Sequence, residues 1–215
     1  MIKSLIREQY GRSIDLLERG RLTEGVIIPS ERECIELLSE QYTNAQITHI
    51  QEKIRRPVFQ IVPQKPFTDF ESAINLNGRW EVIIKPYLQE RFAKMPSSNE
   101  VQIGFIEGKI KPPGISRELF TIQKQAELYK KTLPTGVTVI HPRNYALLQL
   151  DGKVDVTYGH KSPLEDNSND SDDVPCGYYN VEWVGFDAWP SDSGPASGSS
   201  GLTWRASVML TVNYN

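Results

Sequence analysis

The sequence predicts an α+β protein in which a helical N-terminal part is followed by a largely antiparallel β-sheet. Apolar residues recur every three or four positions at the start of the chain, which is typical of an amphipathic helix. Near the end of the chain the period changes to strict alternation, which is typical of a half-buried strand. We expect a helix-rich part with short strands over residues 1–133 and an antiparallel β part over residues 134–215. The pattern leaves open whether these are one domain or two.

Two helices are expected first. The first begins at Ile2 and ends near Gly20. The second begins at Ser30, where Glu33 stands at the position that completes a capping box. We expect it to continue to Pro57, with the basic residues Lys53, Arg55 and Arg56 in its last turn, where positive charge suits the helix dipole.

The middle of the chain is expected to alternate between strands and helices. Strands are predicted at 58–63, at 79–84 and at 101–110. We interpret residues 66–95 as a strand followed by a helix, because Pro86 makes one continuous helix costly. A further helix is expected after Ser116.

After Pro134 every expected element is a strand. Residues 145–159 are interpreted as a hairpin with Gly152 in a left-handed bulge, because that register keeps one face apolar. The last two strands, 178–189 and 202–214, are expected to pair through one apolar face. Long polar loops are expected at 160–176 and 191–201. The last strand is expected to be central in its own sheet or completed by a neighbouring subunit, because its edge carries almost no charge.

Composition excludes several classes of protein. The 215 residues are 39% hydrophobic and 24% charged, as in ordinary globular proteins. No apolar run approaches the ~20 residues that a membrane helix needs, and the first twenty residues carry acids, unlike a secretory signal. Cys34 and Cys176 are too few for a disulfide framework. We therefore expect no membrane association and a location in the cytoplasm of the producing cell.

Charge is unevenly distributed along the chain. Residues 1–161 carry 23 Lys and Arg against 19 Asp and Glu, whereas residues 162–215 carry eight acids and only Arg205 as a base. An acidic C-terminal quarter repels nucleic acid, whose binding depends on phosphate neutralisation. Nucleic-acid binding is therefore not expected.

The acidic stretch "LEDNSNDSDDVP" (164–175) offers the ligand types of a calcium site without their spacing. A calcium-binding loop that began at Asp166 would need glycine at its sixth position and an acid at its twelfth, where Ser171 and Gly177 stand. Clustered carboxylates on a Ser/Asn background are typical of a solvated loop. We expect neither a metal site nor a cofactor.

One short motif suggests an enzyme as an alternative. Glu107-Gly-Lys109 lies on an expected strand, with acids upstream at Asp69, Glu81 and Glu100. The motif resembles the acid-x-Lys pair of PD-(D/E)xK nucleases, which implies metal-dependent phosphodiester hydrolysis. A surface ion pair that protects a strand edge is the interpretation we favour, so no catalytic residue is expected. His49, His141 and His160 do not have the spacing of a zinc site.

Aromatic residues gather in the C-terminal part. Trp189 stands beside Pro190 and the Gly/Ser-rich stretch 191–201, and Trp and Tyr are common anchors of protein interfaces. The expected partner-binding residues are Trp189, Ser193, Gly194, Ser197 and Gly198. A small-ligand-binding β module around Trp183 and Trp189 is a second alternative.

We therefore expect a non-enzymatic structural or assembly subunit of a multi-protein particle. The two long loops and the aromatic beside one of them are similar in architecture to the neck, tail or baseplate subunits of bacteriophages and contractile injection machines. That resemblance implies other protein subunits as partners, in a homo- or hetero-oligomer, and a place in a virion.

Overall fold

A computed structural model describes residues 2–42, 57–76, 81–107, 137–151, 161–163, 173–179, 183–190 and 208–214. This part of the chain contains five helices and eight strands, so the α+β class is confirmed. The helices are α1 (Ile2–Arg19), α2 (Glu31–Gln41), α4 (Phe67–Leu76), α5 (Pro86–Ala93) and α7 (Pro142–Asp151). The strands are β1 (Pro57–Pro63), β2 (Glu81–Ile84), β3 (Val101–Glu107), β4 (Val137–Val139), β5 (Lys161–Pro163), β6 (Asp173–Tyr179), β7 (Trp183–Pro190) and β8 (Val208–Tyr214). Helices and strands interleave along the chain, so the expected order of helices first and sheet second is wrong.

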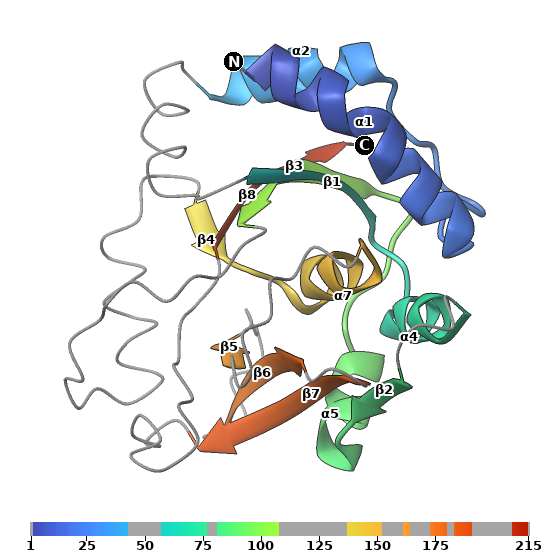
Figure 1. Ribbon diagram of the computed structural model, residues 1–215, viewed down its shortest axis with the longest axis vertical. Coiled ribbons are helices and arrows are strands. Elements are labelled where there is room, and N and C mark those ends of the chain that lie inside the picture. The colour runs from blue at the N-terminus through green and yellow to red at the C-terminus, as the bar shows by residue number, and fades with distance from the viewer. Residues whose placement is uncertain are drawn as a thin grey trace, which may run out of the picture.

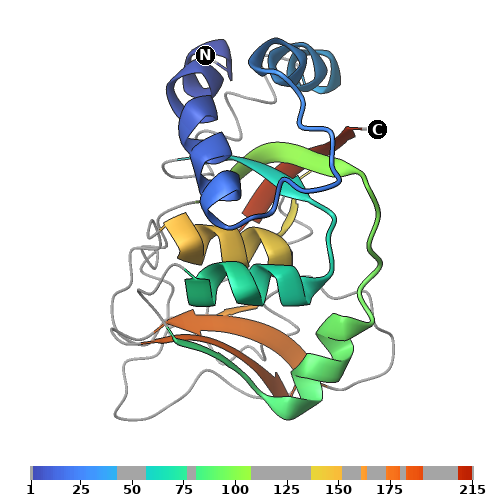
Figure 2. The same cartoon turned by 90° about the vertical axis from the view of Figure 1, so that its right-hand side faces the viewer.

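The described elements form stacked layers (Figures 1 and 2). Helices α1 and α2 cover one face of a sheet, which we call sheet A and which has the strand order β1-β3-β8-β4. Helices α4 and α7 lie on its other face and separate it from sheet B, which has the order β2-β7-β6-β5. Helix α5 stands at the end of β2. Sheet A is therefore buried between two helical layers.

The two sheets mix strands from distant parts of the sequence. Sheet A is antiparallel throughout, and β8 lies inside it, hydrogen-bonded to β3 on one side and β4 on the other. In sheet B, β2 pairs with β7 in parallel, and the other pairs are antiparallel. The expected pairing of the last two strands is wrong, since β7 belongs to sheet B and β8 to sheet A. The alternating pattern identified β8 as a strand but contained no information about its partners.

Helix α1 ends in a tight turn in which the adjacent residues Gly20 and Arg21 have different roles. The Leu22 N–H donates to the Leu17 carbonyl at 2.8 Å and the Arg21 N–H to the Glu18 carbonyl at 3.0 Å, with Arg21 in the left-handed region at φ 54°. Gly20 precedes the left-handed position. A Cβ placed on Gly20 would lie 3.0 Å from the Ala73 side chain and 3.2 Å from that of Leu150. This glycine therefore permits close packing of α1 on α4 and α7.

Helix α2 begins as the sequence predicts and ends earlier. The Ser30 N–H donates to Glu33 Oε2 at 2.7 Å, and the Glu33 N–H donates to Ser30 Oγ at 3.3 Å, which confirms the capping box. The helix ends at Gln41, and Tyr42 is extended, with its hydroxyl donating to the Thr211 carbonyl at 3.1 Å. The expected continuous helix to Pro57 is wrong, because Tyr42 turns away to bind β8. Residues 43–56, with the basic cluster, lie outside the described residues.

Helix α7 replaces the first half of the expected hairpin over 145–159. Every residue from Pro142 to Leu150 is buried, so the segment has no solvent-facing side. Its sequence therefore lacks the polar face that identifies a surface helix, and a short apolar run without that face is ambiguous between helix and strand. Gly152, at the expected bulge, lies outside the described residues.

The segment between β1 and β2 contains a helix, α4, at residues for which the sequence predicted no separate element. In α4 the buried residues Phe67, Phe70, Ala73 and Ile74 recur at helical spacing on the side facing the molecule. Strand β2 and helix α5 follow, and Pro86 is the first residue of α5, where its missing N–H costs nothing. The strand-then-helix interpretation is confirmed for residues 81–93, and helix α4 before them was not predicted.

Helix α1 covers the outer edge of β1, the terminal strand in the described strand order of sheet A. The Gln9 side chain donates to the Pro57 carbonyl at 3.2 Å and accepts from the Phe59 N–H at 2.9 Å. The Ser13 hydroxyl accepts from the Ile61 N–H at 3.1 Å. These two side chains, one helical turn apart, thus occupy the place of a neighbouring strand and block pairing with another chain.

No helix in the described ranges is both long and apolar enough to span a membrane.

Candidate functional site

In the described structure the acids of the nuclease alternative come from different elements or from opposite ends of one strand. Glu107 is the last residue of β3 and Glu100 directly precedes its first residue, so their Cα atoms lie about 24 Å apart at ~3.4 Å per residue. Glu81 begins β2 in the other sheet, and Asp69 lies on α4. Glu100 and Glu107 therefore cannot bind the same ion. Lys109 lies outside the described residues.

The expected partner-binding residues are only partly described. Trp189 is the second-last residue of β7, where its backbone pairs with Val174 of β6, and Trp183 begins the same strand. Ser193, Gly194, Ser197 and Gly198 lie outside the described residues. Of the acidic stretch, Asp173–Pro175 form the start of β6 and the rest lies outside. These expectations stay predictions.

Metal and thiol sites have little support in the described ranges. Within them, no group of three or more His, Cys, Asp or Glu residues could hold a metal ion. Cys34 is fully buried in α2, and burial raises the pKa of its thiol to about 12. It is a core residue, as its place in an apolar stripe predicts. Cys176 lies in β6.

Arg143, in the first turn of α7, makes the densest set of polar contacts described. Its Nε donates to the Lys65 carbonyl at 2.7 Å, its Nη2 to the Pro96 carbonyl at 2.6 Å and its Nη1 to Gln64 Oε1 at 3.3 Å. The residue is 2% exposed, and burial lowers the pKa of its guanidinium to about 10. The carbonyl groups that stabilise the guanidinium charge thus come from two connecting segments, one between β1 and α4 and one between α5 and β3. We call this group the Arg143 clamp.

His141 caps the same end of α7. Its Nδ1 accepts from the Arg143 N–H at 3.3 Å, and its carbonyl accepts the first helical bond, from the Tyr145 N–H at 3.0 Å. Burial, followed by the nearby Arg143 charge, lowers the pKa of the imidazole to about 4. The neutral ring is therefore a structural hydrogen-bond acceptor, and its position suits a cap better than a proton-transfer role.

Polar side chains also stand in the core between α7 and β1. The Gln60 amide donates to the Asn144 carbonyl at 3.3 Å, but Gln60 Oε1, both amide atoms of Asn144 and Gln149 Nε2 make no hydrogen bond. All three residues are at most 2% exposed. A cavity of about 10 Å³ adjoins Gln60 and Ser13, which is room for about one water molecule. This cluster is too enclosed to admit a substrate.

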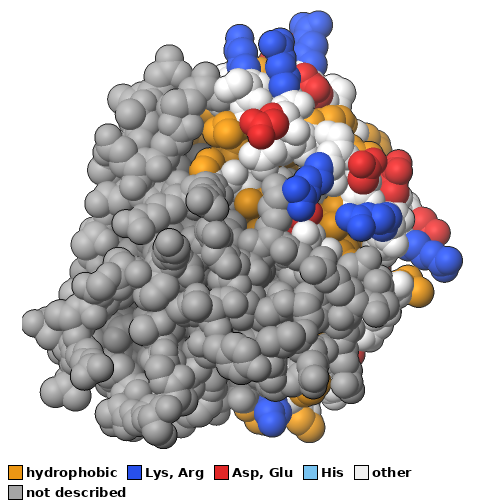
Figure 3. Space-filling model, in the orientation of Figure 1, with side chains coloured by type: hydrophobic (Ala, Val, Ile, Leu, Met, Phe, Trp, Pro, Cys, Tyr) orange, Lys and Arg blue, Asp and Glu red, His pale blue; other side chains and the backbone are white. Residues whose placement is uncertain are grey.

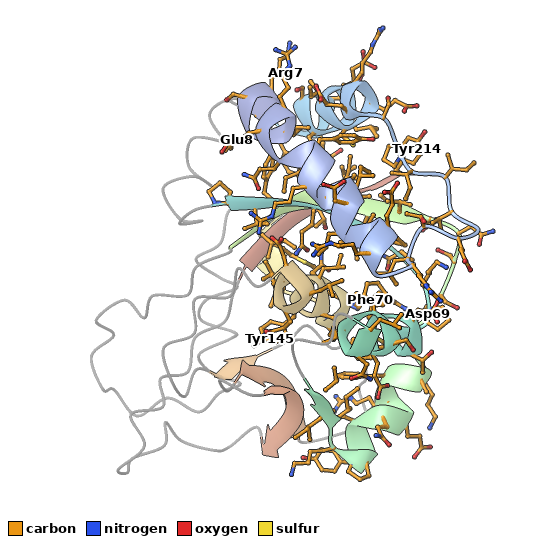
Figure 4. All side chains as sticks on the ribbon, turned by 45° about the vertical axis from the view of Figure 1, so that its right-hand side comes forward. Arg7, Glu8, Asp69, Phe70, Tyr145 and Tyr214 are labelled. Atoms are coloured by element: carbon orange, nitrogen blue, oxygen red, sulfur yellow. The ribbon has the colours of Figure 1, made fainter. Side chains whose placement is uncertain are left out.

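A second polar junction joins α2 to β8. The Tyr214 hydroxyl donates to Glu33 Oε1 at 3.0 Å, and bonds from Ser30 and from Tyr214 lower the pKa of this carboxyl. Together with the Tyr42 contact to Thr211, the junction fixes α2 across the end of β8. Figure 4 shows Tyr214 at this upper layer, far from Tyr145 in the layer between the sheets.

A groove of about 450 Å³ lies beside β2 of sheet B, and we call it the α4–α5 groove. Its apolar lining comes from three elements: Phe67 of α4, Ile84 of β2, and Phe92 and Ala93 of α5. The Phe67 and Phe92 ring centroids lie 4.4 Å apart. Its polar lining is Thr68, Glu71, Gln89 and Glu90. The polar lining thus holds two carboxylates, Glu71 and Glu90, and one hydroxyl, that of Thr68.

Sequence reasoning missed both the Arg143 clamp and the α4–α5 groove. Arg143 lies just before the hairpin expected at 145–159, so its burial was not expected. The groove depends on α4, whose helical spacing of Phe67, Phe70 and Ile74 was present in the sequence but was not used. The missed signal was thus the helical period of 67–76.

Comparison with known proteins provides no further constraint: no family model, no curated protein and no solved structure matches this chain.

Proposed function

We propose that this chain is a non-enzymatic structural subunit of a multi-protein particle, of the kind found in phage necks, tails or baseplates and in contractile injection machines. The α4–α5 groove is the observation that supports this best. It opens on the surface, it is floored by apolar side chains, and its described lining holds two acids. Such a groove is suited to receiving a side chain of another subunit.

Several polar side chains of the described residues hold the fold together. Arg143 joins two connections, His141 caps α7, and Gln9 with Ser13 covers the edge of β1. The surface over α1 and α2 mixes both signs of charge (Figure 3). A mixed surface of this kind lacks the single-sign stripe expected of a nucleic-acid binder.

Trp189 and residues 191–201 remain the second proposed contact with a partner. An eleven-residue stretch rich in Gly and Ser beside an aromatic is suited by its composition to packing on another chain. Trp189 is the second-last residue of β7, next to this stretch in the sequence.

Sedimentation velocity of the purified full chain tests the function. We expect a concentration-dependent species larger than the 24.4 kDa monomer, or a stoichiometric complex with an identified subunit of the same particle. Deleting residues 192–200, or Trp189→Ala, should weaken this association while circular dichroism stays unchanged. A monomer at all concentrations that cleaves DNA or RNA with magnesium, and loses this activity in Lys109→Ala, would instead support the nuclease alternative.

A further inference from the structure

The two helices that form the α4–α5 groove each place one acid on its lining. Glu71 comes from α4 and Glu90 from α5. Glu71 is half-buried, and within the described residues it has no ion-pair partner. A carboxylate without a cation beside it can accept charge-assisted hydrogen bonds from a cation of another molecule.

The second acid is available as well. Glu90 Oε1 contacts Lys94 Nζ at 2.8 Å, one turn along α5, and these two side chains are 75% and 74% exposed. An exposed pair of this kind contributes little and is easily exchanged. Glu90 can therefore turn from its neighbour to an incoming cation without loss to the fold.

Below the two acids the groove is apolar. Phe67, Ile84 and Phe92 are each at most 7% exposed and form its floor. An arginine fits this combination better than a lysine, because its stem packs on apolar surface while its planar head offers five N–H donors to more than one carboxylate. Arginine is also enriched among the residues that anchor protein interfaces.

We propose that the α4–α5 groove receives an arginine side chain of a neighbouring subunit, held by Glu71 and Glu90 over the Phe67–Phe92 floor. The inference rests on the proposed function and names the chemistry of the partner surface. It predicts a subunit contact that weakens with salt, because the groove is open to solvent.

A blocked pentapeptide, acetyl-Gly-Val-Arg-Val-Gly-amide, is the probe. Titrated into the ¹⁵N-labelled full chain, it should shift the amide resonances of residues 67–71 and 89–93 and approach saturation. The same peptide with glutamate in place of arginine should bind at least tenfold more weakly. Glu71→Gln combined with Glu90→Gln should weaken the arginine peptide at least tenfold, with thermal unfolding unchanged.

Asp69→Asn is the matched control, because it removes one acid from the same helix at a position outside the lining (Figure 4). It should change the affinity by less than twofold. Equal binding of the two peptides, equal binding to the double variant, or an equally strong effect of Asp69→Asn would overturn the proposal. Binding of acetyl-arginine-amide as tight as that of the peptide would also overturn it, in favour of a small cationic ligand.

Sedimentation of the double variant separates the two proposals. If the full chain associates and the double variant does so equally well, the groove proposal fails and the subunit function stands. If the groove binds the peptide but the full chain neither self-associates nor has a stoichiometric partner, the subunit function fails and the groove remains a binding site.

Discussion

Helices α1 and α7 lie on opposite faces of sheet A and use their polar residues in opposite ways. In α1 the charged side chains are exposed to solvent. Two of its uncharged polar side chains, those of Gln9 and Ser13, hydrogen-bond to the edge of β1. In α7 the polar residues Arg143, Asn144 and Gln149 are buried, and only the first has its side-chain hydrogen bonds made. An outer helix thus has a free side for its polar groups, whereas a central helix must satisfy each one internally or leave it unpaired.

The comparison predicts that substitutions in α7 cost more than equivalent ones in α1. A buried polar group that loses its partner retains its full desolvation cost, while an exposed one returns to water. The following experiments would break or sharpen this difference.

Arg143→Met should have the largest effect. It leaves the Lys65 and Pro96 carbonyls without their donor and removes the link between two connections. We expect a loss of about 3–5 kcal/mol in the free energy of unfolding by urea denaturation. Arg19→Met, at the exposed end of α1, is the control and should change it by less than about 0.5 kcal/mol. Equal effects of the two variants would contradict the comparison.

The cap of α7 should make stability depend on pH. The pKa of His141 is about 4 in the folded protein against 6.5 ordinarily, so between these values the unfolded chain holds more protons. The contribution of His141 to the free energy of unfolding is therefore fully present above pH 6.5 and decreases as the pH drops towards 4. The decrease is up to about 3 kcal/mol, at 1.4 kcal/mol per pKa unit. Urea midpoints at pH 7.5, 6 and 5 measure this.

His141→Asn keeps a side-chain acceptor for the Arg143 N–H but does not titrate in this range. It should flatten the pH dependence between 6.5 and 4. An unchanged slope would assign the effect to another group.

The end of α1 provides a matched pair at adjacent positions. Gly20→Ala places a methyl group 3.0 Å from Ala73 and 3.2 Å from Leu150 of α7, and should destabilise the protein by about 1–3 kcal/mol. Arg21→Gly relieves the left-handed backbone and should stabilise it by about 1 kcal/mol. Differential scanning calorimetry should therefore show melting temperatures that move in opposite directions. A tolerated Gly20→Ala would show that the contact between α1 and α7 can relax.

Gln9→Leu should have the smallest effect on stability. It removes two bonds at the partly buried edge of β1, worth about 1 kcal/mol together in this setting. The uncovered edge should also make the protein associate more readily at high concentration, which light scattering measures. Glu8→Gln, the neighbouring exposed substitution, should change neither. An unaltered stability and scattering profile in Gln9→Leu would show that water covers this edge equally well.

The contrast between the two helices also explains what the sequence could predict. The α1 stripe and the Ser30–Glu33 box depend on residues close in sequence and on a solvent face, so both were predictable. The run Tyr145–Leu150 is buried on all sides and carries no period that separates helix from strand. The strand partners of β8 depend on residues far away in sequence, which local patterns do not specify.

The candidate site was harder to predict than the fold. The α4–α5 groove requires Phe67, Ile84 and Phe92 from three elements to meet, and no motif contains them. The two arms of the Arg143 clamp are backbone carbonyls, which have no residue signature. Glu107 was selected for its neighbour Lys109, but Glu100 stands at the opposite end of β3.

The inner position of β8 has a consequence for how the chain acquires its structure during synthesis. Val101 pairs with Tyr214 and Ile106 with Met209, so β3 is translated long before its inner neighbour exists. Until β8 leaves the ribosome, β1 and β3 form a ribbon with one unpaired edge, and β4 has none of its described partners. Completion of such a non-local sheet is expected to be slow, and a chain interrupted before β8 should be prone to aggregate or be degraded.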